Sequence, residues 1–531
     1  MLSNSIASLG SKGEPRQTGR ALLWGLEFIG RHPLPILALP STWYFIFYLP
    51  FWKSSDVLCQ LGDPFSSENI LLVPPLYCLV GRIPFWLTDT LLLGSAPNLF
   101  TFQHPSLTAV YVLIVCQHVG LWLALRYFVL TLPASATSRG AITLLLASIA
   151  SFYAFAHTAG AEATTAITWF TLFGVGFRVM SNGATWKTWI LYVLILLLCI
   201  GSRHVSALLL GWMPVTAFLL FIFRSLGSKG SSSASLFARV AGISLLLSVL
   251  VLGLEKTIVW AMCEHFGVIQ REMVGRTLCE RIGSFLNSLS PAEKAQVERK
   301  VSRSNDQPEL KIALDSLIRV GTYYEGSSEV IAQALKERGL QGEQLRAEVD
   351  RITLQAALRY YRTFDIRLIG ITITDVLRGF YPTNDQGIAL TGPKATFYSV
   401  GDIEKNPTAW AQLRSLLFFD PIIARGTLEK ASKDIMIRHW RFLPIAIWCL
   451  VFAMIGGWRM VRGKLSLDLA IVATCIFGIG LAVYLATCIC NLTQPRYVLP
   501  LWVGTIAAGC TAIAGTRINQ GTKVRGRNSE S

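Results

Sequence analysis

Charge is the feature that this sequence has least of. Only 15% of its 531 residues are charged, whereas a soluble globular chain carries about 25%. Hydrophobic residues make up 52%, and long apolar stretches alternate with short basic ones. This distribution excludes an ordinary soluble domain and predicts a protein whose main partner is the lipid bilayer.

Phosphate-binding loops are also missing. Neither G-x-G-x-x-G nor G-x-x-x-x-G-K-[ST] occurs, so no soluble nucleotide site is indicated. The net charge of +16 would suggest nucleic acid on a soluble protein. Here most Lys and Arg residues stand at the ends of apolar segments, which is the positive-inside pattern of membrane proteins. We therefore expect no nucleic-acid partner.

Zinc-ligand spacing is absent as well. Cys488 and Cys490 form a C-x-C pair, but no second pair or histidine follows at zinc spacing. Four other cysteines fall in predicted outer segments, where disulfides remain open; they are Cys59, Cys78, Cys263 and Cys279.

A cleavable signal peptide is not visible in the first thirty residues, which are polar and lack a long apolar core. The first span is therefore expected to stay in the mature protein. The segment 20–31 has the composition of a short interfacial helix.

Ten apolar segments approach the length of about 20 residues that a bilayer core of about 30 Å requires. They lie near 33–52, 106–130, 141–158, 161–178, 187–202, 204–224, 238–262, 441–458, 467–490 and 497–516. Because charged or titratable residues avoid lipid, Ser202-Arg203-His204 is interpreted as a tight turn between two spans. The predicted fold class is an all-α polytopic membrane protein with about ten transmembrane helices.

The positive-inside rule places both termini in the cytoplasm. The resulting organisation has five parts: a cytoplasmic segment 1–32, a membrane domain 33–262 with an outer loop 53–105, an extracytoplasmic segment 263–440, three further spans in 441–516, and a basic cytoplasmic tail 517–531.

The extracytoplasmic segment 263–440 is predicted to be water-exposed and mostly helical. Ser290-Pro291-Ala292-Glu293 has the pattern of a capping box with proline at the first helical position. Further helices are expected over 327–338, which Gly339 ends, and over 343–362. The stretch 380–410 is rich in loop-forming residues.

The first outer loop carries the most suggestive polar residues. Asp56 follows the first span directly, where a carboxylate could act as a general base on a lipid-borne substrate or bind a divalent ion. Asp63 and Glu68 have the same chemistry, but they also fit ordinary solvated loop acids. Tyr77 and Arg82 follow in the same loop and are candidates for substrate binding.

Polar residues at the outer ends of other spans lie at the same predicted membrane level. These candidates for substrate binding are His157, Glu162, Arg203, His204, Arg496 and Tyr497. Arginine suits phosphate because its planar guanidinium donates two parallel hydrogen bonds. The alternatives are that each arginine simply reaches the lipid–water interface and that His157 is a packing residue. His118, in mid-span, is interpreted as a buried histidine satisfied by hydrogen bonds.

Two short motifs resemble the GT-C class of polytopic glycosyltransferases. One is the acidic start of the first outer loop followed by Pro74-Pro75-Leu76-Tyr77, and the other is Gln494-Pro495-Arg496-Tyr497-Val498-Leu499-Pro500 before the last span. The resemblance implies an extracytoplasmic active site, a polyprenyl-phosphate sugar donor, Asp56 as the catalytic or metal-binding acid, and Arg496 near the donor phosphate. The divalent ion would be Mg²⁺ or Mn²⁺. Family members often carry a pair of acids, whereas Asp56 stands alone.

The sequence therefore favours a membrane glycosyltransferase in a bacterial plasma membrane. Three alternatives remain: a transporter or flippase of a lipid-linked or anionic substrate, a protein like an O-antigen polymerase or ligase, and a purely structural membrane scaffold. The uneven division into seven and three spans argues against the matched halves that many transporters show.

Overall fold

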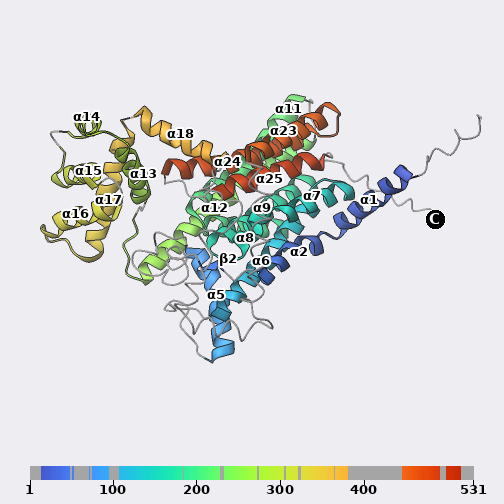
Figure 1. The fold of residues 1–531 in the computed structure, drawn as a ribbon, viewed down its shortest axis with the longest axis horizontal. Helices are drawn as coiled ribbons and strands as arrows, with labels where there is room; N and C mark the ends of the chain where they lie inside the picture. Colours follow the sequence, from blue (N-terminus) through green and yellow to red (C-terminus); the bar gives the residue numbers. More distant parts are fainter. Residues whose placement is uncertain are drawn as a thin grey trace, which may run out of the picture.

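A computed structural model describes most of the chain and is almost entirely helical (Figure 1). The described residues are 14–47, 51–52, 71, 75–94, 107–182, 184–227, 232–271, 274–303, 306–320, 324–363, 365–380, 445–490 and 498–515. Within these ranges the only strands are β1 (Phe51–Trp52) and β2 (Thr158–Ala159), which pair in parallel.

Most helices of the bundle come from residues 14–265. Its helices are α1 (Glu14–Arg31), α2 (Pro33–Phe47), α5 (Pro75–Leu93), α6 (Leu107–Thr131), α7 (Ala136–Ser148), α8 (Ala150–Ala156), α9 (Ala161–Asn182), α10 (Trp186–Ile200), the 3₁₀ helix η2 (His204–Gly211), α11 (Trp212–Gly227) and α12 (Ser232–His265). The helices α23 (Ile445–Val461), α24 (Leu467–Cys490) and α25 (Leu499–Ala514) complete it. One continuous apolar core joins the two parts, since Trp169 of α9 and Trp502 of α25 belong to the same buried cluster.

The described part of the chain is an all-α, multi-pass membrane protein. Five of its helices are long and apolar enough to cross a bilayer, and the bent pair α7–α8, with a 58° break, would make a sixth. The apolar helices α10, α23 and α25 are shorter. A helix lies within each of the ten segments predicted as spans, so their helical nature is confirmed, while the number ten stays a prediction.

Glycines allow close helix contacts at two crossings of the bundle. A β-carbon on Gly140 of α7 would overlap the backbone carbonyl of Leu26 in α1. In the same way, Gly480 of α24 lies against Pro500 and Gly504 of α25. Small residues are typical of such interfaces, because they let two helix backbones approach each other.

A second group of helices has an apolar core of its own and lies at one end of the bundle (Figure 1). It comprises α13 (Val274–Asn287), α14 (Pro291–Val301), α15 (Pro308–Val320), α16 (Tyr324–Lys336) and α17 (Gly342–Tyr361), and we call it the α13–α17 cluster. A further helix, α18 (Ile366–Phe380), connects this cluster to the bundle.

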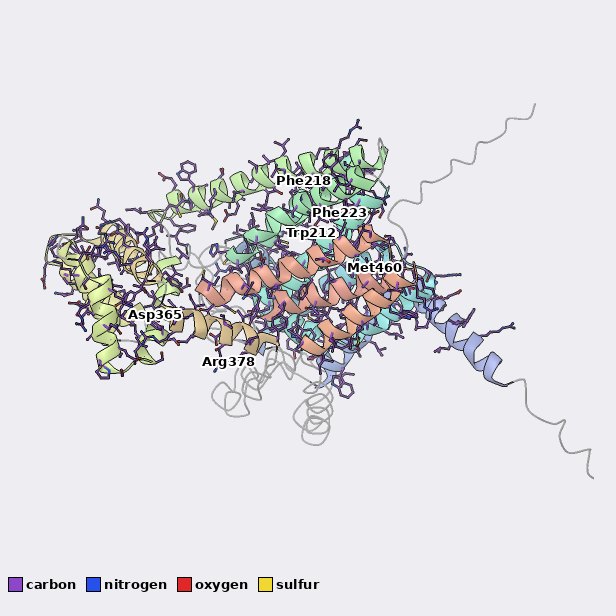
Figure 2. The ribbon with its side chains drawn as sticks, turned by 90° about the horizontal axis from the view of Figure 1, so that it is seen from above. Trp212, Phe218, Phe223, Asp365, Arg378 and Met460 are labelled. Carbon is purple, nitrogen blue, oxygen red and sulfur yellow. The ribbon has the colours of Figure 1, made fainter. Side chains whose placement is uncertain are left out.

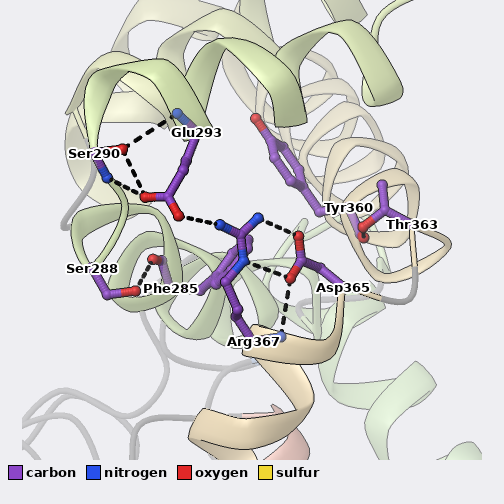
Figure 3. Close-up of polar contacts among 8 residues, drawn as sticks. All are labelled: Phe285, Ser288, Ser290, Glu293, Tyr360, Thr363, Asp365 and Arg367. Carbon is purple, nitrogen blue, oxygen red and sulfur yellow. Dashed lines mark hydrogen bonds and ion pairs between the residues drawn. The ribbon is translucent and has the colours of Figure 1, made fainter.

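The local predictions within this cluster are confirmed. Ser290 and Glu293 form the expected capping box at the start of α14, with both reciprocal hydrogen bonds present (Figure 3). The other two expected helices correspond to α16 and α17, and Gly339 after α16 has a φ of +88°, a left-handed conformation that suits glycine.

The cysteines Cys78, Cys263 and Cys279 are free thiols.

No helix is predicted between residues 53 and 105, yet α5 occupies part of this loop. The helix α18 is not predicted by a pattern of its own either. The loop-rich stretch 380–410, apart from Phe380 itself, lies outside the described residues.

Candidate functional site

A short parallel strand pair brings two distant polar segments together. Phe51 of β1 pairs with Thr158, and Trp52 pairs with Ala159 of β2. β2 occupies the turn between α8 and α9, so the beginning of the predicted outer loop lies beside the residues that lead to Glu162. This pairing joins the two residues that precede the predicted outer loop to the turn between α8 and α9.

Three predicted site residues from three chain segments lie together at this end of the bundle. The Arg203 guanidinium approaches the Glu162 carboxylate at 4.0 Å between Nη2 and Oε1. The backbone N–H of Tyr77 donates to the carbonyl oxygen of Gly201 at 3.0 Å, which joins the start of α5 to the turn before Arg203. We call this group the Tyr77–Glu162–Arg203 cluster.

Glycines make room for this cluster. A β-carbon on Gly201 would overlap the side chain of Leu76, so only glycine allows α5 to pack so closely on the turn after α10. A β-carbon on Gly160 would lie 2.5 Å from Oε2 of Glu162. Because glycine has no side chain, Gly160 leaves the space that the Glu162 carboxylate occupies.

The cluster is shielded from water. The side chains of Arg203 and Glu162 are only 13% and 7% exposed, and Tyr77 is buried. Their separation of 4.0 Å is longer than the 2.7–2.9 Å of a tight charge-assisted hydrogen bond. The two charges thus stabilise each other at this distance without a tight hydrogen bond between them.

The Tyr77 hydroxyl is a buried polar group with no hydrogen-bond partner in the described part of the chain. Burial, followed by the nearby Glu162 carboxylate and the Cys78 thiol, raises the pKa of Tyr77 well above its ordinary value. The hydroxyl therefore keeps its proton and can donate a hydrogen bond. An unsatisfied buried donor costs free energy and calls for an explanation.

Arg82 is buried on the same helix, a turn and a half beyond Tyr77. It shares the buried face of α5 with Cys78, Phe85 and Asp89, whose spacing is that of one helix side. A buried arginine and a buried aspartate on one face are costly unless both are paired. Sequence reasoning missed Asp89, although this spacing was a signal for it.

His157 faces another histidine rather than this cluster. Its Nδ1 lies 3.1 Å from Nε2 of His118, and His118 Nδ1 lies 2.7 Å from the Ser41 hydroxyl. The indole N–H of Trp122 donates to the same hydroxyl at 2.6 Å. The interpretation of His118 as a hydrogen-bonded core histidine is confirmed, and Ser41 is the partner that the sequence did not reveal.

The remaining predicted residues divide into two groups. His204, the first residue of η2, is exposed beside Arg203. The others lie outside the described residues: Asp56, Asp63, Glu68, Arg496 and Tyr497. Among the described residues, no three His, Cys, Asp or Glu side chains are grouped so that they could hold a metal ion.

Chemically, the Tyr77–Glu162–Arg203 cluster offers a cation and a neutral hydroxyl donor in a poorly hydrated place. Such donors bind an anionic oxygen, and low hydration strengthens the interaction.

Comparison with protein-family models, with curated proteins and with solved structures found no match for the chain.

Proposed function

We propose that the protein is a membrane glycosyltransferase that moves a sugar from a polyprenyl-phosphate-linked donor to an extracytoplasmic acceptor. The observation that carries this proposal is the convergence of Tyr77, Glu162 and Arg203 from α5, α9 and the turn after α10. The GT-C resemblance of the first outer loop agrees with it.

The chemistry of the cluster suits a lipid phosphate. Arg203 supplies a planar donor for two phosphate oxygens, and the Tyr77 hydroxyl supplies a further donor. Glu162 keeps the guanidinium oriented and offsets its charge when no anion is bound. As the sugar leaves, these donors stabilise the negative charge that accumulates on the phosphate.

The surroundings also suit a lipid tail. Three apolar side chains on α5 are 43–44% exposed, namely Val80, Ile83 and Leu87. Their spacing of three and four residues places them on one side of the helix. A polyprenyl chain lying along this side would bring its phosphate toward the Tyr77 end of α5.

In the proposed reaction, the acceptor hydroxyl oxygen attacks the anomeric carbon and forms the new glycosidic bond. The bond between that carbon and the phosphate oxygen breaks, and the phosphate leaves with the electron pair. Asp56, four residues after the paired strand residue Trp52, takes the proton of the acceptor hydroxyl. This role for Asp56 comes from the resemblance, and no step uses a metal ion.

A binding experiment tests the phosphate site without knowledge of the sugar. Polyprenyl phosphate should raise the melting temperature of the protein in detergent, and Arg203→Gln should weaken its binding about tenfold or more. Lys187→Gln is the matched control, since Lys187 is an exposed cation at the other end of α10, about 20 Å away along the helix. Equal affinity in all three proteins would contradict the phosphate site.

A turnover experiment separates transfer from transport. Polyprenyl-phosphate hexose in proteoliposomes, supplied with an alcohol as sugar acceptor, should release polyprenyl phosphate, and Asp56→Asn should abolish this release while binding persists. Movement of the intact labelled lipid between leaflets, without cleavage, would instead support the flippase alternative.

A further inference from the structure

The exposed side of α18 is its most apolar side. Ile366, Ile369, Ile373 and Leu377 are 80%, 46%, 53% and 55% exposed. Steps of three, four and four residues along a helix keep these side chains on one face. We call them the α18 stripe.

The buried side of α18 carries the polar contacts instead. Asp375 is buried and accepts a hydrogen bond from Arg281, which is fully buried in α13. The Tyr484 hydroxyl of α24 donates to the Asp375 carbonyl oxygen at 2.8 Å. A helix on a water-soluble surface shows the opposite pattern, with its apolar face inward and its polar face in water.

Ion pairs hold α18 near both ends, so its rotation about its own axis is fixed. At the first turn, Arg367 contacts Asp365 and Glu293, with Nη to carboxylate distances of 2.8 Å to each (Figure 3). Near the other end, Arg281 and Arg378 both contact Asp375. Figure 2 shows α18 running between the labelled residues Asp365 and Arg378, from the α13–α17 cluster to the bundle.

The position of α24 gives the membrane level of α18. Its 24 residues span about 36 Å, against about 30 Å for the hydrocarbon core of a bilayer. Gly379 lies against the Tyr484 side chain, and Tyr484 is about 9 Å before the end of α24 at Cys490. With α24 centred in the bilayer, about 3 Å of it extends beyond each side of the core, so the last turn of α18 lies about 6 Å inside the edge of the hydrocarbon core.

The neighbouring helix α23 also exposes apolar side chains. α18 packs against α23 and α24, and near its first turns α23 exposes Ile447 and Leu450. Arg378 stands half-exposed at the edge of the stripe, where a long cationic side chain can reach lipid headgroups.

We infer that the α18 stripe is a lipid-contact surface. In this arrangement α18 lies in the leaflet at the Cys490 end of α24, and its last turn is the deepest. Its partner is the acyl-chain and headgroup boundary of the bilayer. This differs from the sequence prediction, which placed residues 263–440 in water. The inference does not depend on the proposed activity.

Spin labels on the full-length protein test this assignment. Single cysteines replace Ile369, Ile373 or Leu377, one at a time, in a background whose reactive native cysteines are changed to alanine and whose melting temperature is unchanged. The labelled proteins are placed in vesicles of phosphatidylcholine and phosphatidylglycerol. Collision with oxygen, which concentrates in lipid, is compared with collision with a water-soluble nickel complex.

Two positions provide references. Leu246 of α12 is 69% exposed within a candidate span and represents lipid, while Gln296 is exposed on α14 in the α13–α17 cluster and represents water. We expect labels at Ile373 and Leu377 to resemble Leu246, with depth increasing from Ile369 to Leu377. Labels that resemble Gln296 would overturn the inference. Labels shielded from both reagents would also overturn it, because another part of the chain or a second copy would then cover the stripe.

Discussion

Arg281 of α13 donates hydrogen bonds to the main-chain carbonyl oxygen of Cys488, two residues before α24 ends at Cys490. The last four carbonyl groups of a helix have no partner within the helix. A second side chain of the α13–α17 cluster serves the next of them, since the Tyr361 hydroxyl donates to Ile489 at 2.6 Å. The cluster therefore caps the end of a membrane helix.

Removal of the Arg281 guanidinium should destabilise the protein strongly. Arg281→Gln leaves the buried Asp375 carboxylate without its main partner and uncaps α24. Breaking a buried pair on one side costs about 3–5 kcal/mol. Thermal unfolding in detergent should show a large drop in melting temperature.

The exposed pair of Arg351 and Glu348 on α17 provides the control, because its partners are 45% and 31% exposed. Arg351→Gln should cost about 0–1 kcal/mol, as exposed ion pairs do. Similar melting temperatures for the two variants would mean that the Arg281 contacts do not hold the cluster on the bundle.

The α1–α7 crossing should be sensitive to a single methyl group. In Gly140→Ala, the new β-carbon would overlap the Leu26 carbonyl, and overpacking of this kind costs about 1–3 kcal/mol. Gly25→Ala adds the same atom to α1 where nothing lies within 4 Å, so it should stabilise the helix by about 0.5–1 kcal/mol. Opposite shifts in melting temperature are expected, and shifts of the same sign would argue against the close crossing.

Acid should weaken the attachment of α18 to α14. Hydrogen bonds from Arg367 hold the pKa of Asp365 below its ordinary value of 3.8, and hydrogen bonds from Ser290, with Arg367 nearby, lower that of Glu293 below 4.5. A lowered carboxyl pKa contributes stability that is complete above the ordinary value and is lost as the pH falls through the folded-state value. The melting temperature should therefore fall below about pH 4.

Asp365→Asn tests the origin of this acid effect. The variant should be less stable at neutral pH, because the amide cannot pair with Arg367 as a charge, and its melting temperature should fall less steeply in acid. A pH profile parallel to that of the unchanged protein would assign the acid sensitivity to other carboxylates.

Local features of this fold were predictable from short stretches of sequence. The capping box of Ser290 and Glu293 depends on two residues that are three positions apart, so this four-residue stretch is enough to predict it. By contrast, α5 was missed because its buried face includes Arg82 and Asp89, which made the segment look like a polar loop. The environment of α18 was missed for the related reason that its acid is buried and its isoleucines are exposed.

The candidate site was predictable only as separate residues. Tyr77, Glu162 and Arg203 were each identified by type and predicted membrane level. No spacing in the sequence relates them, because the backbone contact between Tyr77 and Gly201 and the room left by Gly160 bring them together. Long-range contacts of this kind arise from packing rather than from local pattern.

Tyr77→Phe should affect stability and ligand binding in opposite directions. The buried hydroxyl has no partner in the described part of the chain, so its removal should leave the melting temperature unchanged or raise it, since an unsatisfied group costs about 1–3 kcal/mol. If the hydroxyl donates to the phosphate of a bound lipid, the affinity for polyprenyl phosphate should fall about tenfold or more. Tyr153→Phe is the matched control, because the Tyr153 hydroxyl of α8 is likewise buried and without a partner but lies in the apolar core. It should share the effect on stability and keep the affinity, whereas a loss of affinity in both variants, or in neither, would remove Tyr77 from the proposed site.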